Sequence, residues 1–269
     1  MDRRHGIRFR DVFASPSEPL VSDPAIPAAT IIVVCDRPAG PPQLLMVERA
    51  QGMAFAGGAM VFPGGRIDDA DGRLAAALGL GGDGGAKVAA IRETLEETAV
   101  PVAIDPVPSP DLARELQSAL VADADFAKLL NDAGLSLNAD ALAPFARWVP
   151  KFHAARRFDT LFFVAPAPPG EWQPAIIEGE CSAAEWLSAA EVLERDRLGQ
   201  TRLIFPTRRN IERLAQHDSF VEIVADARNY PIEPITPWLE DHEGDRFVTI
   251  AEGIGYPVTR ERLDGLWRG

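Results

Sequence analysis

A strand that ends in a glycine pair, followed by a long helical pattern, constrains the fold of this chain more than any other feature. Residues 59–62 are apolar and stop at Pro63-Gly64-Gly65, where a backbone without side chains can approach another group closely. Apolar residues then recur three and four positions apart over residues 87–98, which predicts a helix with one buried face. A plain tight turn explains the glycine pair equally well.

Three carboxylates share one face of the predicted helix. Glu93, Glu96 and Glu97 stand at positions i, i+3 and i+4, so they fall within about 100° of arc. Their mutual repulsion, roughly 0.2–0.5 kcal/mol per pair, favours a bound cation. Hard divalent cations take oxygen ligands and also neutralise the oxygens of a diphosphate. A solvated acidic face is the alternative, but the carboxylates together with the glycine pair favour a metal-binding loop and helix.

The overall charge excludes one class of partner. The chain of 269 residues has a formal net charge of −13, and we expect no nucleic acid polymer as a partner because neutralising its phosphates requires a basic surface. A small anionic substrate stays compatible, since a metal ion and nearby arginines reverse the potential inside one pocket. Cys35 and Cys181 predict no disulfide framework, and the histidines show no zinc-ligand spacing.

No targeting or membrane segment is visible in the sequence. Residues 1–10 are basic, but no apolar stretch follows them, and the longest apolar runs are too short to cross a bilayer. We therefore expect a cytoplasmic protein with no membrane partner.

The remaining pattern alternates strands with helices and predicts one α/β domain. Apolar and β-branched runs predict strands at residues 30–35, 43–47, 100–104, 158–164 and 180–187. Helical spacing predicts helices at residues 111–121, 125–134, 188–195 and 206–216. The expected organisation is an N-terminal arm at 1–29, a domain at 30–216 with a helical insertion at about 105–146, and a C-terminal extension of short strands and loops at 217–269, packed on the same domain.

The strand, loop and helix together resemble the signature of the Nudix hydrolases. That signature is a glycine, five residues, a glutamate, seven residues, and then Arg-Glu-apolar-x-Glu-Glu-x-Gly-apolar. The positions that match it are Gly65, Arg92, Glu93, Glu96, Glu97 and Val100.

The match has three departures. Thr94 replaces an apolar residue, and Ala99 replaces the glycine. The stretch between Gly65 and Arg92 is longer than usual, with a glycine-rich segment at 81–85. Asp71 stands where the first glutamate is counted, and the extra length leaves its role open.

The resemblance implies a fold, a reaction and a cofactor. The fold is an α/β/α sandwich with a mixed central sheet. The reaction is hydrolysis of a diphosphate linkage in a nucleoside diphosphate derivative by attack of water, with Mg²⁺ or Mn²⁺ as cofactor. Relatives of this kind often form homodimers, so a homodimer is an expected assembly.

The resemblance also implies roles for individual residues. Glu96 and Glu97 would be metal ligands, and Glu93 would be a ligand or a partner of the activated water. The Gly64 carbonyl would complete the metal shell. Arg92 would orient the glutamates through charge-assisted hydrogen bonds.

A more detailed likeness suggests a substrate. Residues 44–50, Gly58 and residues 62–65 look like the motif of coenzyme A diphosphatases, although Ala54 replaces an arginine of that motif. The long insertion in the signature looks like one branch of these enzymes. Coenzyme A or acyl-coenzyme A is therefore the expected substrate, and ADP-ribose, NADH and dinucleoside polyphosphates are the alternatives. Two other classes stay open: a catalytically silent Nudix-fold ligand-binding or regulatory module, and an acidic interaction domain without metal.

Three arginines and one further glutamate are candidates for substrate binding and catalysis. Arg49, Arg156 and Arg157 have the forked geometry that suits phosphate oxygens, although ion pairs with acidic neighbours explain them equally well. Glu180 stands where many Nudix relatives have an extra glutamate, which implies a metal ligand or a general base. Two neighbours compete for that role, Glu178 and Glu185, and a solvated loop carboxylate is the simpler alternative.

Two further sets of residues have both a functional and a structural interpretation. Three tryptophans can stack a base or fill the core: Trp148, Trp172 and Trp186. Thr207-Arg208-Arg209 can bind an anion at a helix N-terminus or simply begin a surface helix.

Overall fold

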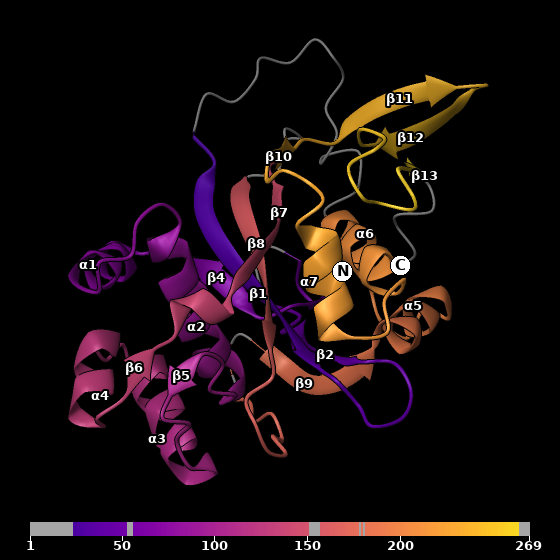
Figure 1. The fold of residues 1–269 in the computed structure, drawn as a ribbon. Helices are drawn as coiled ribbons and strands as arrows, with labels where there is room; N and C mark the ends of the chain where they lie inside the picture. Colours follow the sequence, from indigo (N-terminus) through magenta and orange to yellow (C-terminus); the bar gives the residue numbers. More distant parts are fainter. Residues whose placement is uncertain (1–23, 53–55, 151–156, 178, 180, 264–269) are drawn as a thin grey trace, which may run out of the picture.

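A mixed sheet forms the centre of the computed structural model, which describes residues 24–52, 56–150, 157–177, 179 and 181–263 (Figure 1). Its strands are β1 (Ile26–Cys35), β2 (Gln43–Arg49), β3 (Met60–Val61), β4 (Gly64–Arg66), β7 (Ala143–Trp148), β8 (Phe158–Pro166), β9 (Cys181–Ser188) and β10 (Pro234–Ile235). The order is β10-β7-β8-β1-β2-β3, while β4 pairs with β1 and β9 pairs with β2. β1 runs parallel to β8 and antiparallel to β2 and β4, so the sheet is mixed.

Helices cover both faces of this sheet (Figure 1). One layer contains α1 (Asp69–Ala77), α2 (Gly84–Thr98), α3 (Pro110–Val121) and α4 (Phe126–Asp132). The other layer contains α5 (Ala189–Arg197), α6 (Phe205–Leu214) and α7 (Phe220–Ala227). The predicted α/β/α sandwich with a mixed central sheet is confirmed.

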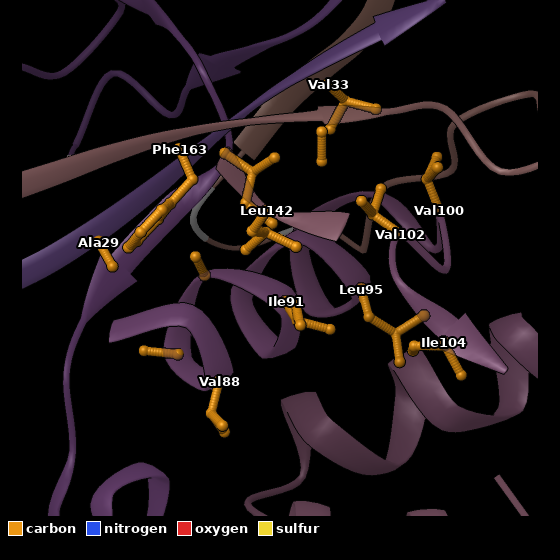
Figure 2. Packing of buried hydrophobic residues seen from close by; sticks show 14 of the residues in the cluster. Ala29, Val33, Val88, Ile91, Leu95, Val100, Val102, Ile104, Leu142 and Phe163 are labelled. Carbon is orange, nitrogen blue, oxygen red and sulfur yellow. The ribbon is translucent and has the colours of Figure 1, made fainter. Parts of the chain in front are cut away.

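The sequence of β1 explains why two layers form. Alternate residues of a strand point to opposite faces of its sheet. Ile31 and Val33 are buried in the core beneath α2, which Figure 2 shows from close by. Ile32 and Val34 are buried in the second core, beneath α6 and α7. A strand that is apolar on both faces belongs at the centre of such a sandwich.

Short elements lie at two edges of the sandwich. β5 (Ile104–Asp105) pairs with β6 (Ser136–Leu137), and the 3-10 helix η2 (Ala139–Ala141) follows. β11 (Trp238–His242), β12 (Asp245–Thr249) and β13 (Arg260–Arg262) form a separate antiparallel sheet. No helix in the described ranges is long and apolar enough to cross a membrane.

Strand pairing moves several predicted boundaries. β1 begins at Ile26, inside the predicted arm 1–29, because its first residues pair with β8 and β4. β7 occupies residues 143–148 and pairs with β8, so the helical part of the insertion predicted at 105–146 ends before it. The predicted strand 100–104 was too long: only its last residue belongs to β5, and Ala103 before it has a φ of 54°, in the left-handed region.

Two helices differ from the predicted pattern. α1 is rich in alanine and has no apolar stripe, and the backbone N–H of Asp68 before it donates to Asp71 Oδ2 at 2.9 Å. α7 lies in the segment 217–269, where short strands and loops were expected. It begins after Ser219 and buries Ile223 in the second core. The C-terminal extension thus contributes a helix to the sandwich.

Candidate functional site

The C-terminal half of α2 carries the three glutamates next to its buried face. Ile91 and Leu95 are fully buried against the sheet (Figure 2). This orientation leaves Glu93 and Glu96 with 15% and 29% of their side-chain surface exposed, while Glu97 is 8% exposed. The shared face therefore runs from solvent into the interior.

The two departures from the signature within α2 have local explanations. Thr94 is fully buried at the apolar position because its hydroxyl donates to the Ala90 carbonyl at 2.8 Å, which leaves no polar group unpaired. Ala99 follows the helix in the left-handed region, with a φ of 57°, where glycine is free of strain and alanine is not. The two departures therefore leave the helix that carries the glutamates intact, and only Ala99 at its end is strained.

The glycine pair lies directly against two of the glutamates. Gly64 and Gly65 belong to β4, so they are part of the sheet and not a plain turn. The N–H of Gly64 donates to Glu97 Oε2 at 3.0 Å. A Cβ on Gly65 would lie 2.4 Å from Cδ of Glu93, and a Cβ on Gly64 would lie 2.4 Å from the carbonyl oxygen of Ala29. Glycine is therefore required at Gly64, where the obstacle is backbone and φ is 153°, whereas a side chain at Gly65 would displace the carboxylate of Glu93.

Arg92 ties the carboxylates together. Its Nε donates to Asp71 Oδ1 at 3.0 Å, and its Nη2 donates to Asp71 Oδ2 at 3.1 Å. Its Nη1 lies 3.0 Å from Glu93 Oε1 and 3.2 Å from Glu96 Oε2. Burial lowers the pKa of Arg92. The hydrogen bond to Asp71 and the neighbouring negative charges raise this pKa by more than burial lowers it, so the guanidinium stays charged.

Asp71 therefore has a defined place despite the longer spacing in the signature. It is 2% exposed and lies on α1, which packs beside α2. The extra residues that follow Asp71 complete α1 and the turn into α2, so the insertion leaves the Asp71–Arg92 contact intact.

Glu97 lies in an environment that disfavours its charge. Burial raises its pKa to about 8, the charge of Glu93 raises it as well, and the Gly64 N–H and the charge of Arg49 oppose these effects. The thiol of Cys181 also donates to Glu97 Oε1, at 3.6 Å. The buried Glu97 and the half-buried Glu93 thus form a pair of carboxylates whose like charges a cation would stabilise.

The arrangement of these elements matches solved structures. A NUDIX hydrolase from Alicyclobacillus acidocaldarius is similar to this chain with a TM-score of 0.63 and 26% sequence identity. The match covers 76% of this chain and 97% of that one. This chain has the Nudix fold. The prediction of that fold is confirmed, and the likeness supports the Nudix family and a hydrolase; the coenzyme A branch stays a prediction.

Other Nudix structures are similar at lower scores. The NUDIX domain of Shewanella oneidensis NrtR, complexed with ADP ribose, has a TM-score of 0.43 at 15% identity, over 75% of this chain and 92% of that chain. The MutT protein from Methanosarcina mazei Go1 has a TM-score of 0.40 at 14% identity, over 73% and 96%. Scores this low support no inference about function. No protein-family model matches the sequence, and no curated protein matches it.

Arg49 lies close to the glutamates of this Nudix fold. It ends β2, next to a bulge, and pairs in register with Cys181 on β9. Its Nε is buried and has no hydrogen-bond partner among the described residues. Its charge lowers the pKa of Glu97. A buried guanidinium donor without a partner, beside the carboxylates, suits an anionic ligand.

The other predicted site residues have a described contact elsewhere or lie outside the described residues. Arg157 precedes β8, and its carbonyl accepts a hydrogen bond from the Ile26 N–H at 2.8 Å. Glu185, which competed with Glu180, forms an ion pair of 2.8 Å with Arg195 on α5. Four residues of the sequence analysis lie outside the described residues: Ala54, Arg156, Glu178 and Glu180.

The tryptophans have structural contacts. Trp148 is 1% exposed, and its Nε1 donates to Asn210 Oδ1 at 3.2 Å, so it belongs to the core as the structural interpretation predicted. Trp172 and Trp186 pack against the first core, and Trp186 Nε1 donates to the Trp172 carbonyl at 2.7 Å.

The arginines at the start of α6 are held by carboxylates instead of facing a free anion site. Arg208 lies 2.6 Å from Asp196 and 2.6 Å from Glu261. Arg209 lies 2.7 Å from Glu212 and 3.0 Å from Glu261. The anion-binding interpretation of Thr207-Arg208-Arg209 is therefore replaced by an ion-pair network that joins α6 to β13.

The glutamates fit a divalent metal ion in donor chemistry. Among the described residues, no group of three or more His, Cys, Asp or Glu side chains is arranged to hold a metal ion as it stands. Mg²⁺, however, is usually held by one or two carboxylates, with waters and substrate phosphates as the other ligands. The pair of Glu93 and the buried Glu97 has the oxygen donors and the negative charge that such an ion requires.

Sequence analysis missed two contacts in this region. Neither Cys181 nor Gln117 was a candidate, yet the first donates to Glu97 and the second to the Glu96 carbonyl. Both contacts join residues far apart in the chain, so no local pattern signals them.

Proposed function

We propose that this chain is a Nudix-type diphosphatase that uses Mg²⁺ or Mn²⁺ to hydrolyse a diphosphate linkage in a nucleoside diphosphate derivative. The observation that carries the proposal is the cluster around Arg92, where Glu93 and Glu96 share its guanidinium and Glu97 is held against the glycine pair. Burying more carboxylates than cationic groups lowers the stability of the fold unless a bound cation neutralises the excess negative charge.

Each residue of the cluster has a role in the proposal. Glu93, Glu96 and Glu97 would hold the metal ion, together with the Gly64 carbonyl. The ion would activate water and neutralise the charge on the diphosphate oxygens. Arg92, fixed by Asp71, would keep the carboxylates in orientation.

The proton of the attacking water requires an acceptor close to the glutamates. Glu93 and Glu180 are the two candidates for this base. Glu93 has 15% of its side-chain surface exposed and is held by Arg92, so it is open to solvent on one side. A general base must lie within hydrogen-bonding reach of the water that it activates.

Arginines would hold the phosphate groups of the substrate. Arg49 is supported by its buried, unpartnered Nε beside Glu97. Arg156 and Arg157 are proposed as further phosphate contacts on sequence grounds. Charge-assisted hydrogen bonds from arginine forks suit diphosphate oxygens.

The proposed substrate is coenzyme A or acyl-coenzyme A. The support is the resemblance of residues 44–50, Gly58 and residues 62–65 to the coenzyme A diphosphatase motif. ADP-ribose, NADH and dinucleoside polyphosphates are the competing substrates. The proposal includes a cytoplasmic location and a homodimer, and it includes no membrane or nucleic acid polymer as a partner.

A screen of these diphosphate compounds with Mg²⁺ and with Mn²⁺ tests the function. The wild-type protein should hydrolyse at least one compound, and turnover should require the metal. Glu97→Gln should lower turnover by about 100-fold or more, because it removes a carboxylate ligand and keeps its shape.

The matched control is Glu185→Gln, which changes a glutamate on β9 that pairs with Arg195. It should keep wild-type turnover. Wild-type turnover by purified Glu97→Gln would overturn the proposed site. A folded wild-type protein with no turnover but tight binding of one compound would favour the silent binding module.

A further inference from the structure

The last turn of α2 carries two of the proposed metal ligands, and several of its carbonyls have their hydrogen-bond partners outside the helix. A helix leaves its last four carbonyl groups without partners inside the helix. Ala99 N–H reaches the Leu95 carbonyl at 2.8 Å and so completes one of them. The carbonyls of Glu96 and Thr98 are completed from other segments of the chain.

A buried glutamine of the insertion supplies one of these partners. Gln117 on α3 is 2% exposed, and its Nε2 donates to the Glu96 carbonyl at 3.0 Å. The same nitrogen donates to the Ala175 carbonyl at 2.8 Å. A primary amide has two N–H donors, so this side chain uses both of them on backbone carbonyls.

The segment before β9 contacts both α2 and Gln117 of α3 through Ala175. The N–H of Ala175 donates to the Thr98 carbonyl at 2.8 Å, while its own carbonyl accepts from Gln117. The backbone of a single residue, Ala175, is therefore tied to α2 through its N–H and to α3 through its carbonyl. Three stretches of chain meet at this point: the end of α2, the middle of α3 and residues 171–177.

Packing alone does not account for an amide at this position. The other buried residues of α3 are apolar, and they are Ala113, Leu116 and Leu120. A buried polar side chain is costly unless its hydrogen bonds are made. Gln117 is thus suited to the two carbonyls and not to the apolar core around it.

We propose that Gln117 is a positioning residue for the last turn of α2. It sets the place of Glu96 and Glu97 and couples the helical insertion to the metal-binding turn. The inference rests on the proposed function, because it concerns the same site. Glu97 must meet the Gly64 N–H at 3.0 Å, so a small shift of the turn changes the place of its carboxylate.

The test compares Gln117→Met with the wild-type full-length protein. Methionine has a similar length but no donor, so the carbonyls of Glu96 and Ala175 lose their partner. The Mn²⁺ concentration that gives half-maximal hydrolysis should rise by about 10-fold to 100-fold, the range seen when residues that orient metal ligands are changed.

Leu120→Ala is the matched control. Leu120 lies on the same helix as Gln117 and is also buried, but its apolar side chain makes no hydrogen bond to α2. Leu120→Ala should lower the melting temperature at least as much as Gln117→Met and leave the Mn²⁺ requirement of the folded protein unchanged. An equal shift in both variants, or no shift in Gln117→Met, would overturn the inference while the proposed function stands.

Hydrogen exchange in the wild-type protein tests the same junction without a variant. Mn²⁺ should slow exchange of the Ala175 amide, because the ion would hold the turn to which that amide is bonded. Unchanged exchange at Ala175 in a protein that binds Mn²⁺ would overturn the inference. A wild-type protein with neither turnover nor Mn²⁺ binding would contradict the proposed function, and the inference with it.

Discussion

Two helices on opposite faces of the sheet, α2 and α6, both bury arginine among carboxylates, but they divide the charges differently. On α6 each arginine has a carboxylate partner, in the pairs Arg208–Asp196, Arg209–Glu212 and Arg213–Asp226. On α2 the guanidinium of Arg92 is shared among Asp71, Glu93 and Glu96. Three arginines thus meet four carboxylates in the α6 network, whereas at α2 three carboxylates share the single guanidinium of Arg92.

The surroundings of the two helices agree with this distinction. Arg213 is 1% exposed and stacks over the Phe145 ring, with 4.3 Å between its Cζ and the ring centroid. Glu96 on α2 keeps 29% of its side-chain surface exposed, so it lies nearer the solvent than Arg213 does. We conclude that α6 serves the scaffold and that α2 serves the site.

The largest expected effect in this comparison is on stability, from Arg213→Met. The change takes the guanidinium away from the half-buried Asp226, leaving it only His217 at 3.6 Å, and removes the stacking on Phe145. The free energy of unfolding should fall by about 3–5 kcal/mol, measured by urea denaturation. The Mn²⁺ requirement of the folded fraction should stay the same. Arg197→Met, which breaks an exposed pair with Glu194, is the control and should leave stability nearly unchanged.

A smaller effect is expected on activity from Asp71→Asn. The variant keeps the shape of the side chain but loses the charge that holds Arg92. Hydrolysis should fall by about 10-fold to 100-fold, because Arg92 no longer orients the glutamates. Asp69→Asn, which changes an exposed residue in the same helix turn, should retain wild-type hydrolysis. Equal activity in the two variants would show that Asp71 only caps α1.

The α6 network should also give a pH dependence of stability. Burial raises the pKa of Glu212 to about 7, from an ordinary value of 4.5. The folded state therefore binds a proton more tightly than the unfolded state, so stability falls as the pH rises from about 4.5 to about 7. Glu212→Gln should weaken this fall, measured as the melting temperature against pH. An unchanged profile would mean that Glu212 does not titrate in this range.

The smallest expected effect is a gain in stability from Ala99→Gly at the end of α2. Alanine is strained at a φ of 57°, and glycine is not. The free energy of unfolding should rise by about 1 kcal/mol. Ala122→Gly at the end of α3, where φ is −89°, relieves no strain and should give no gain. A gain of equal size in both variants would contradict the strain at Ala99.

The sequence predicts those parts of the molecule that local patterns encode. The apolar run of β1 and the three-and-four spacing of α2 predict both elements, because burial on the faces of a strand or helix leaves a period in the sequence. The clustering of Glu93, Glu96 and Glu97 follows from that helix alone. The glycine pair lies against Glu93 and Glu97 although the stretch between Gly65 and Arg92 is longer than in the signature.

The parts that the sequence does not predict depend on distant partners. β7 contains Pro144 and has no clear alternation, and it becomes a strand by pairing with β8. The contact between Cys181 and Glu97 joins residues 84 positions apart. Gln117 finds its two hydrogen-bond acceptors only because Glu96 at the end of α2 and Ala175 in the segment before β9 meet beside it. Pairings of this kind leave no local period.

The measurement that tests the central claim most directly is the melting temperature of three proteins with increasing Mn²⁺: the wild type, Glu97→Gln and Glu185→Gln. Binding to the folded state adds about 2.7 kcal/mol of stability when the ion is at 100 times its dissociation constant. The melting temperature of the wild type and of Glu185→Gln should rise with Mn²⁺, and that of Glu97→Gln should rise much less. No rise in the wild type, or an equal rise in all three proteins, would contradict a metal site at Glu93, Glu96 and Glu97 on α2.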